Sequence, residues 1–136
     1  MRRTHEPPAL ITLIEGSSIA PNTVSQVRSL VESHEKAMVI LDSNHTKSHV
    51  LSELQLYAPL VSVGSYIVAC DGIMEQVAGG PRTESDWGTN NPRQAVVEFT
   101  SGNSDFAIEE PKWPFNEGMV NCRVTYWPDA FVRRLR

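Results

Sequence analysis

The chain has 136 residues and a mass of 15.1 kDa, enough for a single domain over residues 1–136 and too little for two. Its 12 basic and 16 acidic residues give a net charge of −4, which argues against a broad nucleic-acid surface. The sequence shows no signal peptide and no apolar run as long as a membrane span, about 20 residues. The two cysteines lack metal-binding spacing. We therefore expect a cytoplasmic protein with reduced thiols.

The first half of the chain alternates short apolar runs with helical patterns. Strands are predicted at residues 10–14, 37–41 and 66–70, and helices at 21–34 and 46–58. The run 37–41 is apolar at every position, which is typical of a strand covered on both faces. Thr46 is placed to cap the second helix, whose inward stripe is Val50, Leu51, Leu54 and Ala58.

The second half begins with a polar stretch over residues 72–90, which is long for a compact domain and predicts a lid or binding loop. Asn91 and Pro92 then open a helix that ends at Gly102. Residues 106–108 and 120–132 predict two final strands that form an antiparallel hairpin. This order predicts an α/β fold with a mainly parallel sheet, a C-terminal antiparallel hairpin and helices on both faces.

Acidic residues follow two of the predicted strands. Asp42 comes directly after the strand 37–41, and Asp71 follows the strand 66–70. If these strands are neighbours, their ends lie about 5 Å apart, and the two carboxylates could hold Mg²⁺ together with water. The alternative is that each acid only caps a strand end or the next helix.

Other polar residues near these strand ends have two interpretations each. His45 could be a general base, a substrate contact or a metal ligand, or it could make only local hydrogen bonds. Cys70 could be a ligand or a reactive thiol, but is better explained as a small buried side chain. Glu15 and Gly16 could approach a nucleoside, or could simply form a turn.

Aromatic residues gather in the late loops, outside the periodic stripes. They could wall a substrate pocket or cover the edge of the sheet. They are Trp87, Trp113, Phe115 and Trp127.

Longer motifs resemble a known family. The stretch Val39-Ile-Leu-Asp-Ser-Asn-His-Thr46 is its most specific part, and His49-Val-Leu51, Tyr57-Ala-Pro-Leu-Val-Ser62 and Asp71-Gly-Ile73 continue it. Phe115-Asn-Glu-Gly118 and Val124-Thr-Tyr-Trp-Pro128 extend the match almost to the C-terminus. Over residues 11–134 the chain resembles the cephalosporin hydroxylase/rhamnosyl O-methyltransferase family.

The resemblance implies an incomplete Rossmann-like class I methyltransferase fold that uses S-adenosylmethionine and Mg²⁺ or a similar divalent metal. It implies that Asp42 and Asp71 are metal ligands and that His45 lies near the acceptor hydroxyl. It also assigns Glu15, Gly16 and Ser17 to the adenine side, and Trp87, Trp113 and Phe115 to the acceptor pocket. Many relatives have an acid where this chain has Cys70, so the metal site is expected to have two acids rather than three.

Members of this family carry a glycine-rich cofactor loop and two further strands N-terminal to the matching stretch, and neither is found in this sequence. By this comparison the chain is expected to be the C-terminal portion of a methyltransferase, inactive by itself. Residues 37–41 would then form an exposed edge, open to self-association or to pairing with a missing N-terminal half.

The expected function is therefore methyl transfer to a hydroxyl group of a small molecule or glycolipid, in lipid or secondary-metabolite biosynthesis. Two alternatives stay open: a non-catalytic remnant or partner-binding module, and a metal-dependent hydrolase that uses Asp42, Asp71 and His45. The two histidines and one carboxylate that an iron oxygenase needs are not apparent.

Overall fold

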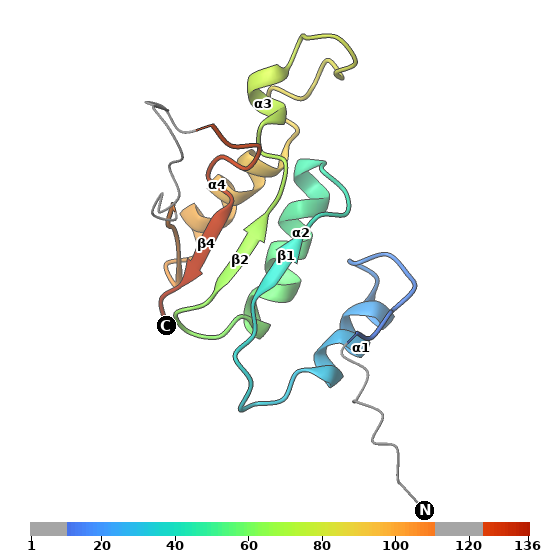
Figure 1. Cartoon of the computed structure of the whole chain (residues 1–136), viewed down its shortest axis with the longest axis vertical. Coiled ribbons are helices and arrows are strands. Elements are labelled where there is room, and N and C mark those ends of the chain that lie inside the picture. Colours follow the sequence, from blue (N-terminus) through green and yellow to red (C-terminus); the bar gives the residue numbers. More distant parts are fainter. Residues whose placement is uncertain (1–10, 111–123) are drawn as a thin grey trace, which may run out of the picture.

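A computed structural model describes residues 11–110 and 124–136. Its elements in chain order are α1 (Pro21–Leu30), β1 (Val39–Leu41), α2 (Lys47–Tyr57), the 3-10 turn η1 (Ala58–Leu60), β2 (Tyr66–Ala69), α3 (Met74–Val77), α4 (Pro92–Gly102), β3 (Phe106–Ile108) and β4 (Phe131–Arg134). The strands form one sheet in the order β1-β2-β4-β3 (Figure 1). Within these residues, every helix is too short or too polar to span a bilayer.

The sheet is mixed. β1 and β2 pair in parallel, and β4 is inserted antiparallel between β2 and β3. β1, β2 and β3 therefore share a direction, but only one of the three ladders is parallel, so the expected mainly parallel sheet is not confirmed. The antiparallel pairing of the last two strands is confirmed. The order of elements could not predict the insertion of β4, because strand order is decided by tertiary packing.

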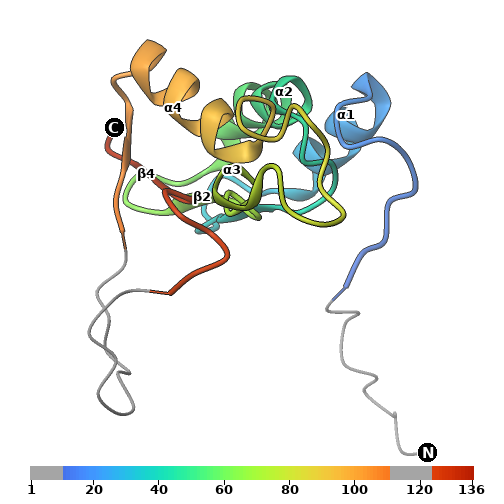
Figure 2. The ribbon, with the colours of Figure 1, turned by 90° about the horizontal axis from the view of Figure 1, so that it is seen from above.

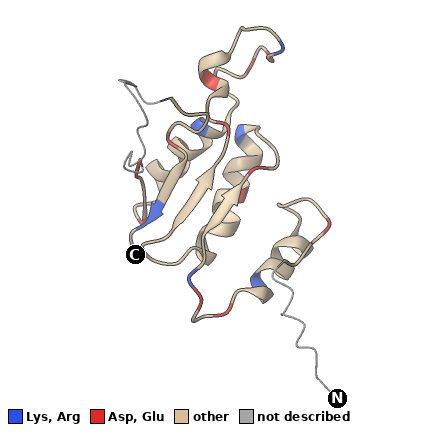
Figure 3. Cartoon of the chain, viewed as in Figure 1, with Lys and Arg blue, Asp and Glu red and all other residues tan. Residues whose placement is uncertain are grey.

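The helices that build the core lie on one side of the sheet. Figure 2 shows α1, α2 and α4 together on that side, whereas helices were expected on both faces. Among the described residues, the other face has no helix over it (Figure 2). Charged residues of both signs are spread over the surface, and neither β1 nor β2 carries one (Figure 3).

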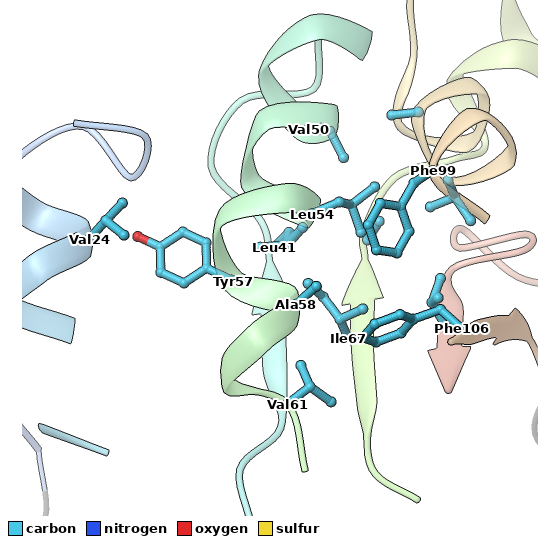
Figure 4. Close-up of a cluster of buried hydrophobic side chains, with 14 residues drawn as sticks. Val24, Leu41, Val50, Leu54, Tyr57, Ala58, Val61, Ile67, Phe99 and Phe106 are labelled. Atoms are coloured by element: carbon cyan, nitrogen blue, oxygen red, sulfur yellow. The ribbon is translucent and has the colours of Figure 1, made fainter. Parts of the chain in front are cut away.

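The core is the space between α2, α4 and the sheet (Figure 4). Its fully enclosed side chains include Leu54, Ile67, Val96 and Val132, each with an exposed fraction of 0%. The stripe expected on α2 is confirmed, since Val50, Leu54 and Ala58 are buried and Leu51 packs against them half-buried. Helical spacing of the apolar residues therefore decides which face of α2 meets the sheet.

The expectations for the N-terminal part are only partly met. Residues 11–14 form no strand, because no neighbouring strand is there to pair with them. The helix predicted over 21–34 ends at Leu30, since Val31 is already extended. In β1 the side chain of Ile40 points away from the core that covers Val39 and Leu41, and it is 58% exposed, so the prediction that 37–41 is covered on both faces is wrong.

Helix capping is shared between distant segments. The Thr46 side chain does not cap α2, contrary to the prediction. Instead, the Asn90 Oδ1 atom accepts a hydrogen bond of 2.8 Å from the N–H of Lys47, and Asn44 Oδ1 accepts one of 2.9 Å from Thr46. The predicted cap of α4 is confirmed, because Asn91 Oδ1 accepts from the N–H of Gln94 at 3.0 Å.

Two segments differ from the predicted boundaries. The polar stretch 72–90 contains the single-turn helix α3 and is otherwise irregular. β4 begins only at Phe131, so the strand predicted over 120–132 is absent from residues 124–130, and its first residues lie outside the described part. The segment 124–130 is irregular and packs against the residues that follow β2, at the end of the sheet where β1 and β2 both stop.

Candidate metal and acceptor site

The candidate site lies where β1 and β2 end. The two strands are parallel and in register, with Leu41 opposite Ala69, and the N–H of Cys70 donates to the carbonyl of Leu41 at 3.0 Å. The residues that follow each strand therefore emerge side by side at one edge. Asp71 adopts a left-handed backbone with φ of 59°, a conformation that aspartate tolerates better than most residues.

Asp42, His45 and Asp71 meet at this edge, and we call them the carboxylate–histidine cluster. One ligand atom of each lies within 4.8 Å of those of the other two. His45 Nε2 is 3.4 Å from Asp42 Oδ1 and 3.4 Å from Asp71 Oδ2, so the imidazole sits between the carboxylates. The expected proximity of the two strand ends is confirmed, while the roles of the three residues stay a prediction.

The carboxylates of the cluster are not used as caps. Among the described residues, the side chains of Asp42 and Asp71 contact only His45 through hydrogen-bonding or ionic contacts, and neither accepts a backbone N–H. Their exposed fractions are 60% and 38%. Two carboxylates turned toward one imidazole and open to solvent match a ligand set better than they match strand caps.

Cys70 lies beside the cluster but does not join it. The residue is 1% exposed, and burial, with the nearby Asp42 and Asp71 charges, raises the pKa of its thiol to about 11. The thiol is also not among the ligand atoms that come together in the cluster. The structure therefore supports the small buried side chain, and the cluster has two acids.

A pocket of about 530 Å³ opens next to the cluster. His45 and Asp71 form its polar part, and Trp87 contributes an aromatic wall from the loop before α4. Its lining residues are Asn44, His45, Thr46, Asp71, Ile73, Met74, Val77, Trp87 and Tyr126. Apolar walls with a few polar groups at one end are typical of small-molecule pockets of this size.

The sequence did not single out Tyr126 as a pocket residue. It is brought there by close packing at Gly72, where a Cβ atom would lie 2.8 Å from the carbonyl oxygen of Pro128. The N–H of Ile73 also donates to the carbonyl of Tyr126 at 3.1 Å. Gly72 was a signal that backbone approaches closely here, but not of which segment does so.

An ion-pair network around Arg93 links the elements next to this pocket. Arg93 on α4 donates to Asp129 at 2.6 Å and to Glu75 on α3 at 2.9 Å. The hydrogen bond to Asp129, followed by that to Glu75, makes the largest contribution to raising the pKa of the Arg93 guanidinium, so this group stays positively charged. The network joins α3, α4 and the segment before β4.

The segment predicted for the nucleoside contributes no ligand atom to the cluster. Glu15, Gly16 and Ser17 are exposed, and the side chains of Glu15 and Ser17 make no hydrogen bond within the described residues. Gly16 has a φ of +147°, and a Cβ atom there would lie 2.6 Å from Thr23 Oγ1. The glycine is therefore explained by its packing against α1, which favours the turn interpretation.

A buried polar network that sequence reasoning missed connects this segment to the cluster. Glu53 is 1% exposed, and its Oε1 accepts from Ser43 Oγ at 2.8 Å. His49 Nε2 lies 3.6 Å from the same oxygen and 3.0 Å from Ser18 Oγ. Ser43 follows Asp42 directly, so the network fixes the loop that carries the cluster. Glu53 lies on the buried stripe of α2, where an acid needs a partner.

The other aromatic residues that the sequence placed at a pocket or a sheet edge have different outcomes. Trp127 is 38% exposed and does not line the pocket beside the cluster. Trp113 and Phe115 lie outside the described residues.

Comparison with known proteins gives a consistent result. The family model described as Rhamnosyl O-methyltransferase/CmcI matches residues 1–135. The rhamnosyl O-methyltransferases of Mycobacterium tuberculosis (strain H37Rv) and Mycobacterium bovis (strain BCG) are 39% identical to this chain over 71 residues, 52% of this chain and 28% of theirs. The rhamnosyl O-methyltransferase of Mycobacterium leprae is 40% identical over 62 residues, 45% of this chain and 27% of its own. The chain thus spans little more than a quarter of these relatives. No solved structure gives a significant match.

Proposed function

Because the chain belongs to the Rhamnosyl O-methyltransferase/CmcI family, we propose that its described residues form the metal-binding and acceptor-binding side of an O-methyltransferase site. The observation that carries this proposal is the carboxylate–histidine cluster at the ends of two parallel strands, beside a pocket. The inserted antiparallel strand β4 is consistent with a methyltransferase-like sheet.

The residues of the cluster fit a divalent metal. Asp42 and Asp71 would hold Mg²⁺ or a similar cation through one oxygen each, with His45 beside them, and water would fill the remaining positions. When bound, such a cation polarises a hydroxyl group and lowers its pKa. Cys70 is not part of the cluster, so the site has two acids.

His45 is placed to handle the proton of the acceptor. Its side chain is 33% exposed, lines the pocket and touches both carboxylates, so a hydroxyl group bound in the pocket is within its reach. The two carboxylates contact the imidazole and orient it. Trp87 and Tyr126 would hold the acceptor, for which we propose a rhamnosyl or related sugar group on a small molecule or glycolipid.

The methyl donor that the family implies is S-adenosylmethionine. We assign no step to Glu15, Gly16 and Ser17, because they are exposed and the packing of Gly16 against Thr23 accounts for the glycine. The proposal for this chain is therefore limited to metal and acceptor.

Metal titration tests the proposal. Calorimetry with Mn²⁺ and Mg²⁺ is expected to show one site, and Asp42→Asn and Asp71→Asn should each weaken it at least about tenfold, as the loss of a ligand requires. Asp105→Asn removes an acid that is not in the cluster and whose side chain, among the described residues, pairs only with Arg136, so it should change nothing. Absence of metal binding by the folded wild-type chain would remove the support for metal assistance.

Cofactor titration separates this proposal from its alternatives. Micromolar binding of S-adenosylmethionine would support methyl transfer by the chain itself. Metal binding with no affinity for the cofactor would favour the hydrolase, which would use the same three residues. A chain that binds neither would be a non-catalytic remnant or partner-binding module.

A further inference from the structure

β1 is an edge strand that is open to pairing. No other strand of the described residues lies along its outer side. The Leu41 carbonyl accepts from Cys70 on the inner side, so the N–H and C=O groups of its neighbour Ile40 face outward. Ile40 is 58% exposed, and β1 carries no charged side chain that would discourage pairing (Figure 3). Such an edge is a template for a further strand.

A cleft of about 430 Å³ lies beside this edge, between β1 and α1. Val27, Leu41 and Tyr57 contribute to its apolar lining. Glu53 also lines the cleft, and its buried Oε2 atom has no hydrogen-bond partner among the described residues. The cleft thus combines apolar walls with an acceptor that lacks a donor, which an added strand could supply.

The chain itself contains a segment suited to this cleft. Residues 11–14, Ile-Thr-Leu-Ile, have the composition of a strand but pair with nothing in the described structure. Ile11 is 76% exposed and Leu13 is 91% exposed. In both views the segment runs past α1, apart from β1 (Figures 1 and 2). It is anchored there by Ser18, whose carbonyl accepts from Tyr57 Oη at 2.6 Å.

We propose that two copies of this chain associate by exchanging the 11–14 segment, each copy laying it along the open edge of the partner's β1. The exchange satisfies the outward N–H and C=O groups of Ile40 and removes Ile11 and Leu13 from water. Because donor and acceptor lie on the same chain, a twofold arrangement makes both contacts at once and closes the assembly. This inference does not depend on the proposed enzymatic function.

Analytical ultracentrifugation from micromolar to millimolar concentration tests the exchange. The wild-type chain is expected to dimerise, and Ile40→Lys and Leu13→Lys should each raise the dissociation constant at least about tenfold, since each places a charge in the new contact. Val63→Lys is the matched control, because Val63 is also 58% exposed but lies outside β1, and it should leave the dimer intact. Circular dichroism verifies that each variant is folded.

Hydrogen exchange on the wild-type chain gives a second measurement that needs no variant. The amides of residues 11–14 and of Ile40 should gain protection as the concentration rises. A monomer at all concentrations would overturn the proposal, including one whose 11–14 segment is protected by its own β1. So would a dimer that dissociates in Ile40→Lys but not in Leu13→Lys, because β1 would then pair with β1 directly. Dissociation of Val63→Lys would place the contact elsewhere.

Discussion

The two halves of the sheet differ in how completely backbone hydrogen bonds are made and apolar side chains are buried. We call the half with β2, β4 and α4 the closed side, and the half with β1 and α1 the open side. On the side of β2, β4 and α4, ladders run on both edges of the inner strands, and Ile67, Val96 and Val132 are fully buried. On the side of β1 and α1, a ladder edge is open, Ile40 is exposed and a cleft separates helix from strand.

The candidate site lies at the boundary between these sides. Asp71 follows the inner strand β2, and Asp42 follows the edge strand β1. A shared register places their carboxylates together, but the loop that carries Asp42 depends on Ser43 and Glu53 for its position. The difference between the two sides shows that a site can be assembled by a single parallel ladder even where the sheet beyond it is open.

The largest expected effect is on the closed side. Leu54→Ala should lower the free energy of unfolding by about 2–5 kcal/mol, because it leaves a cavity between α2 and α4. Val24→Ala in α1 should cost about 1–2 kcal/mol. Urea denaturation measures both. If Val24→Ala were as costly as Leu54→Ala, the two sides would form one core of uniform strength.

At the boundary, Ser43→Ala should cost about 1–3 kcal/mol, because it removes the donor from the buried carboxylate of Glu53. Ser52→Ala, which loses only a local bond to the carbonyl of Ser48 on the same helix, should stay within about 0.5 kcal/mol of wild type. Urea denaturation of the pair decides whether the boundary network stabilises the fold. Equal effects would show that it does not.

On the closed side again, Asn91→Ala should cost about 1 kcal/mol through loss of the α4 cap. Asn91→Asp keeps the cap acceptor but loses the donor to the carbonyl of Trp87, whose hydrogen bond is 2.7 Å. Thermal denaturation should therefore rank Asn91→Asp between wild type and Asn91→Ala. The opposite rank would assign the stabilisation to the Trp87 contact.

The smallest effect on stability at neutral pH concerns Cys70. Its pKa rises from 9.0 to about 11 on folding, so the unfolded chain ionises first. The contribution of Cys70 to the free energy of unfolding should be present at neutral pH and be lost as the pH rises through 9 toward 11, and Cys70→Ala should lose this part of the pH dependence. In a Cys122→Ser background, the native thiol should resist alkylation at neutral pH. Rapid alkylation would show that the boundary is open to solvent at Cys70.

Much of the local structure follows from the sequence. Helical spacing predicted α2 and its buried stripe, an asparagine before proline predicted the start of α4, and acids after two apolar runs predicted the cluster. These predictions succeed because periodicity and capping are properties of neighbouring residues.

The tertiary structure decided what depends on distant partners. Whether residues 11–14 become a strand and where β4 is inserted depend on a neighbouring strand, and whether Ile40 is covered depends on what packs on that face, and no local pattern specifies either. Asn90 at the start of α2 and Tyr126 in the pocket come from segments far along the chain. The residue types that chemistry needs are therefore written in the sequence, whereas their partners are set by packing, because a strand edge or a helix end can be satisfied from any part of the chain.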